Sequence, residues 1–362
     1  MKNESRLIAF YLPQFHPIPE NNEWWGEGFT EWTNVGKAKP LFKGHDQPKI
    51  PSSLGYYDLR LPESREAQAN LAREYGIDGF CYWHYWFGKG KRLLERPFNE
   101  VLSTGKPDFP FCLGWANHSW KAKTWSIEKG KDKLLIQQEY HGLEDYTAHF
   151  YDLLSAFKDH RYLRINNKPL FLIWDPRDIP DASLFIEHWN KLATENGLDG
   201  IHFVAWSFEK KDLNHFINLG FNSVSLDYIK GVFNNRSFLN KILSKTLKVL
   251  KGTPSYIEYK EYMEYVLKNL IIDDRIFPSI APNFDHSPRS GKLGAILVND
   301  SPKLFEKFLK LIFDKLSEKN QETNIVFLKS WNEWGEGNYL EPDLKNGKGF
   351  LEAIKKSKQN YS

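Results

Sequence analysis

The sequence has few cysteines and no long apolar run. Only two of its 362 residues are cysteine. Cys81 and Cys112 lie in separate predicted strands without a metal-type spacing, so we expect two small buried side chains in a reducing compartment, although the thiols could pair. No stretch of about 18 uncharged apolar residues occurs, and none precedes Pro13 as in a signal peptide. This pattern predicts a cytoplasmic protein without a transmembrane span.

A strong excess of one charge is also lacking, whereas aromatic residues are abundant. The 49 basic and 46 acidic residues leave a formal net charge of +3, which gives no reason to expect a nucleic-acid partner. The chain has 13 Trp, 17 Tyr and 26 Phe. Many of the Trp residues stand beside Asn, His, Gln and Glu in loop-like stretches. This distribution is typical of a surface that stacks flat ligands.

Apolar runs alternate with amphipathic segments along the whole chain, with no break that would mark a linker. Strands are expected at residues 7–12, 79–86, 109–115, 169–174, 201–206, 222–226, 276–281 and 324–330. Helices are expected at residues 62–75, 92–103, 143–158, 182–195, 211–218, 257–270, 302–317 and 349–358. Eight strand–helix units in a chain of this length predict an α/β fold, a single (β/α)8 barrel domain over residues 1–362.

The connections after the strands carry most of the polar and aromatic residues. Residues 14–61 form a long loop after the first strand, which is typical of a lid or binding loop. Other extended loops are expected at the same C-terminal face, where barrel active sites lie. No Gly-x-Gly-x-x-Gly or Walker-type loop follows a strand, which weakens the alternative of an open nucleotide-binding sheet.

Two carboxylates follow the last predicted strand. Glu333 and Glu336 are three positions apart in Trp331-Asn-Glu-Trp-Gly-Glu-Gly337, so a helical turn would place both on one face. A close carboxylate pair is the equipment of a retaining glycosidase. Trp331 and Trp334 would offer flat faces to a sugar ring, with Asn332 beside them. The alternative is that the two acids only complement the positive end of a following helix.

Further side chains at the strand ends and in the long loop are candidates for substrate binding. Loops that follow barrel strands carry function more often than other loops do. The candidates are Tyr11, Gln14, His16, Trp25, Glu31, Trp32, Asn34, His84, Trp86, Asn117, Trp120, Asp175, Trp206, Asp285 and Arg289.

Several candidates have structural alternatives. The residues between Tyr11 and Asn34 could anchor or pack the long loop instead of binding a sugar. His84 could be a satisfied polar group, and Asp175 could open a turn before Pro176. Arg289 could clamp an acidic sugar or a phosphate, or brace Asp285. No His, Cys or Asp spacing matches a metal site, so we expect neither a metal nor a cofactor.

A basic stretch interrupts the barrel pattern. Residues 229–256 contain six Lys or Arg and no Asp or Glu, and their leucines follow helical spacing. This indicates an additional amphipathic helix whose basic face is solvated. The alternative is peripheral contact with an anionic membrane or glycan.

Six motifs occur in order: Phe10-Tyr-Leu-Pro-Gln-Phe-His16, Trp24-Trp-Gly-x-Gly-Phe-Thr-Glu-Trp-Thr-Asn34, His84-Tyr-Trp86, Trp115-Ala-Asn117, Pro282-Asn-Phe-Asp285 with Arg289, and Trp331-Asn-Glu-Trp-Gly-Glu-Gly337. Through them nearly the whole chain resembles the WbsX-type, glycoside hydrolase family 99-like proteins, which are associated with bacterial surface polysaccharides. The resemblance implies a barrel that acts on a bacterial glycan. It departs at His118, where the family often has an acid.

The resemblance also implies roles for the carboxylate pair. In the related endo-α-mannanase and endomannosidase family, the first Glu takes a proton from the sugar 2-hydroxyl and the second acts as acid and then as base. On this sequence the resemblance implies that Glu333 takes the proton from the 2-hydroxyl and should be ionised. Glu336 would then be the acid and base, with a pKa raised by burial.

The sequence therefore predicts a retaining, metal-independent glycosidase, of endo type, that acts on a bacterial surface polysaccharide or its precursor. One alternative is a glycosyltransferase or transglycosylase of polysaccharide biosynthesis. Another is a barrel that binds glycan without turnover, which widely separated carboxylates would favour. The sugar, the linkage and the oligomeric state are not specified by the sequence.

Overall fold

A computed structural model describes residues 3–122, 133–235 and 254–359. Eight parallel strands close into a barrel in the order β3-β2-β1-β13-β11-β9-β8-β7, because β3 also pairs with β7. The first strand pairs in parallel with the last, with Arg6 opposite Ile325. The barrel strands are β1 Arg6–Tyr11, β2 Gly79–His84, β3 Phe111–Trp115, β7 Lys168–Ile173, β8 His202–Ser207, β9 Ser223–Asp227, β11 Ile276–Ile280 and β13 Ile325–Leu328. The predicted (β/α)8 fold is confirmed.

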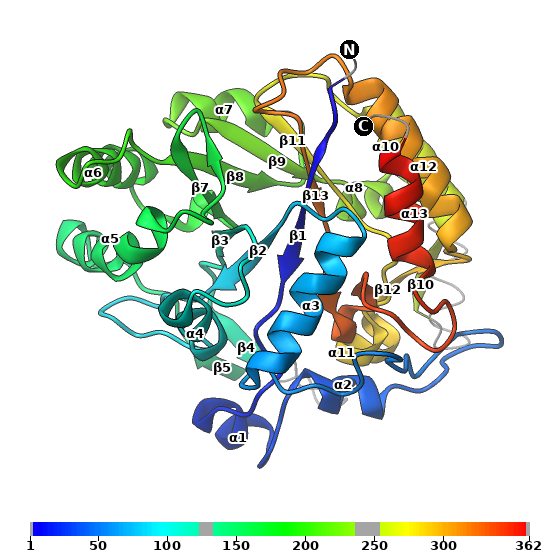
Figure 1. The fold of residues 1–362 in the computed structure, drawn as a ribbon. Coiled ribbons are helices and arrows are strands. Elements are labelled where there is room, and N and C mark those ends of the chain that lie inside the picture. Colours follow the sequence, from blue (N-terminus) through cyan, green and yellow to red (C-terminus); the bar gives the residue numbers. More distant parts are fainter. Residues whose placement is uncertain (1–2, 123–132, 236–253, 360–362) are drawn as a thin grey trace.

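Helices surround the barrel, and each of the eight helices predicted for the strand–helix units is present (Figure 1). Side-chain caps from Asp181 and Ser301 begin two of them. The helix predicted from residue 92 begins instead at Arg96, because Pro97 fits only in a first helical turn. These helices are α3 Pro62–Glu74, α4 Arg96–Thr104, α5 Leu143–Lys158, α6 Ala182–Glu195, α7 Asp212–Asn218, α10 Tyr259–Asn269, α12 Pro302–Leu316 and α13 Gly349–Lys358.

The structure adds short elements around the barrel, and apart from α8, which lies in the stretch of the expected basic helix, the sequence did not indicate them. Seven-residue helices, for example, are too short to show an apolar period. The additional helices are α1 Pro19–Trp25, α2 Glu31–Lys37, α8 Ile229–Asn234 and α11 Ser287–Ser290, with 3₁₀ turns η1 Pro176–Asp178, η2 Gly291–Leu293 and η3 Trp334–Glu336. The additional strands are β4 Trp120–Ala122, β5 Lys133–Ile136, β6 Arg164–Ile165, β10 Ser255–Glu258, β12 Ala295–Val298, β14 Asn332–Glu333 and β15 Asn338–Tyr339.

Aromatic side chains fill the barrel below its C-terminal mouth. The Phe10 ring stacks on Trp83 at 4.7 Å between centroids and on Phe327 at 5.1 Å. Trp206 packs edge-on against Phe10 and lies 4.7 Å from Trp174. Cys81 and Cys112 are buried free thiols on neighbouring strands, as expected. The barrel therefore has a solid aromatic floor beneath its mouth.

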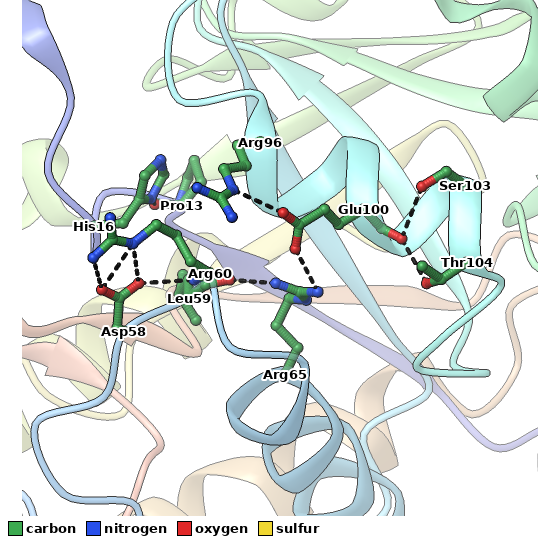
Figure 2. Close-up of polar contacts among 10 residues, drawn as sticks. All are labelled: Pro13, His16, Asp58, Leu59, Arg60, Arg65, Arg96, Glu100, Ser103 and Thr104. Carbon is green, nitrogen blue, oxygen red and sulfur yellow. Dashed lines mark hydrogen bonds and ion pairs between the residues drawn. The ribbon is translucent and has the colours of Figure 1, made fainter.

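The long segment between β1 and α3 is tied back to the barrel wall near α4. Figure 2 shows Arg65 reaching from α3 to Glu100 of α4 at 2.8 Å and to the Leu59 carbonyl at 2.5 Å. Arg96 holds the same Glu100 carboxylate at 2.7 Å. The Arg65 side chain is almost fully buried, whereas the Glu100 side chain is 30% exposed. This ion pair fixes the end of the segment at the start of α3.

The expected basic helix over 229–256 lies mostly outside the described residues; only 229–235 and 254–256 are described. In the described ranges no helix has both the length and the apolar character needed to cross a bilayer.

Candidate active site

A cavity of about 650 Å³ lies at the C-terminal ends of the barrel strands. Its walls come from the β1–α3 segment, from the ends of β2, β3 and β7, from the β4–β5 hairpin and from the loops that carry α11 and η3. Eight of the residues predicted for the site line this cavity: Gln14, Trp25, Glu31, Asn34, Trp120, Arg289, Glu333 and Glu336.

One guanidinium holds three carboxylates together in the cavity. Arg289 Nη2 donates to Glu333 Oε2 at 3.0 Å, and its Nη1 donates to Glu336 Oε1 at 2.6 Å. Its Nε donates to Glu31 Oε1 at 2.9 Å. Each nitrogen of Arg289 thus contacts a different carboxylate. Arg289 does not brace Asp285, because its Nε, Nη1 and Nη2 each donate to a carboxylate of the cavity.

The loop that carries Glu333 and Glu336 is fixed from below by the first strand. The Trp331 N–H donates to the Phe10 carbonyl at 2.7 Å. The Asn332 side chain binds both backbone groups of Leu12, accepting from its N–H at 2.7 Å and donating to its carbonyl at 3.0 Å. Strands β14 and β15 then pair antiparallel, with Glu333 opposite Asn338. The pair therefore sits on a hairpin attached to the end of β1.

A buried carboxylate supports the same loop from behind. Trp334 stacks on Tyr339 at 3.8 Å, and its Nε1 donates to Glu341 Oε2 at 2.6 Å. Glu341 also accepts from Tyr57 Oη at 2.8 Å and from Gln68 Nε2 at 2.6 Å. Burial raises the pKa of Glu341 to about 7. Sequence reasoning missed this residue, because its position depends on contacts with α3 and the β1–α3 segment.

The two carboxyls of the pair have very different proton affinities. Burial raises the pKa of Glu333 to about 7, against the effect of Arg289 and with help from the negative charges of Glu336 and Glu31. Burial also acts to raise the pKa of Glu336, but Arg289 and His286 outweigh it and hold that pKa well below its ordinary value. This order is the reverse of the one expected from the sequence. The reason is that Glu336 has the shorter contact to Arg289 and a second one to His286, whose Nε2 lies 3.5 Å away.

A buried cation lies beside the pair. Lys329, at the end of β13, lines the cavity, and its Nζ donates to Asp227 Oδ2 at 3.0 Å. The ammonium also lies over the rings of Trp174, Trp206 and Phe284 at 5.6 to 5.9 Å. Asp227 outweighs burial and keeps the pKa of Lys329 above its usual value, so the ammonium stays charged.

The two tryptophans of the Glu-bearing motif do not face the cavity. Trp331 and Trp334 are both fully buried, so neither presents a face to a sugar. Asn332 is equally buried and binds only protein groups. Trp32 packs against Trp334 and Tyr57. These four side chains pack beneath the loop and support it. The sequence places them next to the carboxylates but does not specify that they point away from the cavity.

At the end of β2, odd-numbered and even-numbered side chains point in different directions. Trp83 and Tyr85 line the cavity, whereas His84 and Trp86 point toward α5. His84 Nε2 lies 2.8 Å from His149 Nε2, and Trp86 donates its indole N–H to Asp145 at 3.2 Å. The motif predicts His84 and Trp86 as site residues, whereas the two-residue period of a strand places Trp83 and Tyr85 together on the other face.

The remaining predicted residues also lie outside the cavity lining. Tyr11 donates to Gln68 on the outer side of β1. His16 contacts the Pro13 carbonyl (Figure 2). Asn117 joins β3 to β7 by accepting from the Asp175 N–H. Trp206 lies in the aromatic floor, and Asp285 binds two side chains of the β1–α3 segment.

Other cavity residues had no place in the sequence prediction. Trp174 and Lys329 stand one position beyond strands β7 and β13, where an inward direction continues the alternation of the strand. His118, Ser119 and Lys121 belong to the region of the β4–β5 hairpin. In the described parts of the chain, no group of three or more His, Cys, Asp or Glu side chains is placed to hold a metal ion.

Comparison with known proteins gives a family and a fold. A family model described as Glycosyltransferase WbsX matches residues 7–354. Uncharacterized protein WxcX from two strains of Xanthomonas campestris pv. campestris is 34% identical over 358 residues, which are 97% of this chain and 49% of that protein. The chain therefore spans about half the length of these curated relatives.

Solved structures with the same fold share little sequence with the chain. The GH99 endo-alpha-mannosidase from Bacteroides thetaiotaomicron has a TM-score of 0.59 at 14% identity and covers 98% of this chain and 97% of its own. A protein described as glycoside hydrolase-like also has a TM-score of 0.59, at 13% identity, over 98% of this chain and 94% of its own. At such identities the likeness establishes the fold alone.

Proposed function

Because the chain belongs to the Glycosyltransferase WbsX family, we propose that it acts on the glycosidic bonds of a bacterial surface polysaccharide or its precursor. We propose a retaining, metal-independent glycosidase of endo type, with Glu333 and Glu336 as its catalytic pair. The GH99 endo-alpha-mannosidase, which has the same fold, offers a precedent for this chemistry on such a barrel.

The observation that carries the proposal is the sharing of one guanidinium by Glu333 and Glu336 at the mouth of the barrel. Two carboxylates bound to the terminal nitrogens of one planar group lie close together, as retention of configuration requires. Their position in one cavity argues against a barrel that only binds glycan, for which separated carboxylates would be expected. Trp25, Trp83, Trp120 and Trp174 in the same cavity supply faces for sugar rings.

The proton balance of the pair suits acid–base chemistry. Because the pKa of Glu333 is raised to about 7 and Glu336 is ionised, the pair holds one proton below pH 7 and about half a proton at pH 7. In the proposed reaction, one carboxyl gives its proton to the leaving glycosidic oxygen and the other carboxylate takes a proton from the sugar 2-hydroxyl. The oxygen at C2 then displaces the leaving group from C1 to form a 1,2-anhydro sugar, which water opens to restore the original configuration.

The roles implied by the resemblance require the proton on Glu336 at the moment of reaction. In the free site it resides on Glu333. A glycan that enters between Arg289 and Glu336 would weaken their 2.6 Å contact and favour transfer of the proton to Glu336. The total number of protons on the pair stays the same.

A second candidate is transfer of the glycan to another sugar instead of to water, which the description of the family as glycosyltransferases favours. Both functions are tested by incubating the protein with surface polysaccharide and lipid-linked repeat units of the source strain, with and without an added oligosaccharide acceptor. Release of discrete oligosaccharides supports the retaining hydrolase if the new reducing end has the same anomeric configuration as the cleaved bond. Products that form only with the acceptor support transfer, and no product under either condition contradicts both.

A further inference from the structure

We propose that Glu31 is a positioning residue for the catalytic pair: it fixes Arg289 from the β1–α3 segment and thereby sets how firmly the pair holds its proton. The inference rests on the proposed function of Glu333 and Glu336. It gives Glu31 a task within the protein instead of the sugar contact that its sequence motif suggested.

The contacts of Glu31 are directed at the site and not at solvent. Glu31 is the first residue of α2, and only 1% of it is exposed. Its Oε1 accepts from Arg289 Nε at 2.9 Å and from Asn34 Nδ2 at 3.4 Å. Arg289 therefore joins Glu31 to both carboxylates of the catalytic pair. A rotation of the guanidinium that broke its contact with the pair would also break its contact with Glu31.

The loop of the pair is shaped to admit the Glu31 carboxylate. A Cβ atom at Gly335 would lie 1.5 Å from Glu31 Oε1 and 3.1 Å from Arg289 Nε. Gly335 stands between Glu333 and Glu336, and its backbone is not in the left-handed region that favours glycine. Glycine is thus needed here for space. Any side chain at position 335 would push Glu31 away from Arg289.

The electrostatic consequence follows from the charges that face Glu333. These are Arg289 on α11, Glu31 on α2, Glu336 on η3 and Lys329 at the end of β13, with His286 and the Tyr85 hydroxyl at the margin. Glu31 adds a negative charge that raises the pKa of Glu333, and it also shares the guanidinium that would otherwise lower that pKa. Without the charge of Glu31, the pair would release its proton at lower pH.

The decisive experiment compares the pH dependence of kcat/KM for wild type and Glu31→Gln, with release of oligosaccharides from the source strain's polysaccharide as the assay. Gln has the size of Glu and keeps an oxygen for Arg289 Nε. We expect the alkaline limb of the profile to move down by about one pH unit. Glu27→Gln is the matched control, because Glu27 is an exposed residue of the same segment outside the cavity lining; its profile should not move.

A second variant separates charge from position. Glu31→Asp keeps the charge but draws it back from Arg289, so it should keep the wild-type limb better than Glu31→Gln while kcat falls. An unchanged limb in Glu31→Gln would overturn the inference, and so would an equal loss of activity at every pH with a lower Tm, which indicates a packing role. If Glu333→Gln and Glu336→Gln retain full activity, the proposed function itself fails, an outcome distinct from an unmoved limb.

Discussion

The single proton shared by Glu333 and Glu336 depends on a few contacts of single atoms. Burial favours the neutral form of both carboxyls, and the distances to Arg289 and His286 decide which one keeps the proton. The sequence shows that two carboxylates follow the last strand, but it does not show which of them lies closer to a cation. For this reason the pair could be predicted from its spacing, whereas the order of its pKa values was predicted in reverse.

We predict that kcat/KM declines as the pH rises above about 7, approaching a tenfold decrease for each further unit. A carboxyl with a raised pKa holds its proton below that pKa and loses it above, and the pKa of Glu333 is about 7. Either assignment of acid and base needs one proton on the pair. Initial rates at low substrate concentration between pH 5 and 9 measure this limb. An activity that rises through pH 7 and stays high would contradict the prediction.

For the binding residues too, the sequence predicted the location but not the local contacts of each side chain. Gln14, Trp25, Asn34 and Trp120 line the cavity as their motifs suggested, because loops after barrel strands gather at one face. Trp331, Trp334, His84 and Trp86 stand in motifs that also lie at the ends of barrel strands, but they point into the protein. Motif membership therefore located the correct loops, and the direction of each side chain depended on strand alternation and on packing that lies outside the motif.

At the scale of elements, the β1–α3 segment is a folded wall of the site whose middle is anchored to the α11 loop. Asp285 Oδ2 accepts from His45 Nε2 at 2.7 Å and from Gln47 Nε2 at 2.6 Å, and its Oδ1 accepts from the Ser287 N–H at 2.9 Å. His45 Nδ1 accepts from the Leu41 N–H, so its Nε2 carries the hydrogen donated to Asp285. One buried carboxylate thus ties the segment to the loop that carries Arg289.

Replacement Asp285→Ala should lower the free energy of unfolding by about 3 kcal/mol, because it leaves buried donors without an acceptor. Protease cleavage between residues 38 and 50 should become faster. Urea denaturation and limited proteolysis measure the two effects. Asp46→Ala is the control, since its ion pair with Lys49 is partly exposed and contributes less than about 1 kcal/mol. Equal effects of the two substitutions would show that Asp285 is not the anchor.

The contact between β2 and α5 contains two buried imidazoles. His84 Nε2 and His149 Nε2 are 2.8 Å apart, and burial holds the pKa of each well below its usual value. In the unfolded chain both histidines bind protons below about pH 6.5. Stability should therefore be full above that pH and decrease as the pH falls below it, by about 2 kcal/mol for each imidazole at pH 5.

Thermal unfolding of wild type and His149→Gln at pH 7.5 and pH 5 tests this expectation. The variant loses one of the two titrating groups, so its Tm should fall less between the two pH values than that of wild type. The comparison within each protein removes any constant cost of the substitution. An equal decrease in Tm for both proteins would place the acid sensitivity elsewhere.

At the scale of the whole molecule, the repeated strand–helix pattern was sufficient to predict the barrel. Each barrel strand is a short apolar run and each main helix has an amphipathic period, so local sequence and global fold agree. The elements that shape the site lacked such signals. The helices α1 and α2 have seven residues each, and the β14–β15 hairpin has two-residue strands whose position is set by contacts with β1.

The barrel brings residues from opposite ends of the chain into one site. Glu31 and Arg289 are 258 positions apart, and β1 pairs directly with β13. The positions of the proposed catalytic pair, of Arg289 and of Glu31 therefore depend on closure of the complete barrel. The similarity to the WxcX relatives extends over 97% of this chain and 49% of their length.

The most direct test of the account is oligosaccharide release from the source strain's polysaccharide by wild type, Glu333→Gln and Glu336→Gln. Both variants keep the size of the side chain and an oxygen that can accept from Arg289, so correct folding can be verified by an unchanged Tm. We predict that each substitution lowers kcat/KM by about a thousandfold or more, because a missing acid or base removes its whole share of proton transfer. Near wild-type release by either folded variant would contradict the assignment of the catalytic pair.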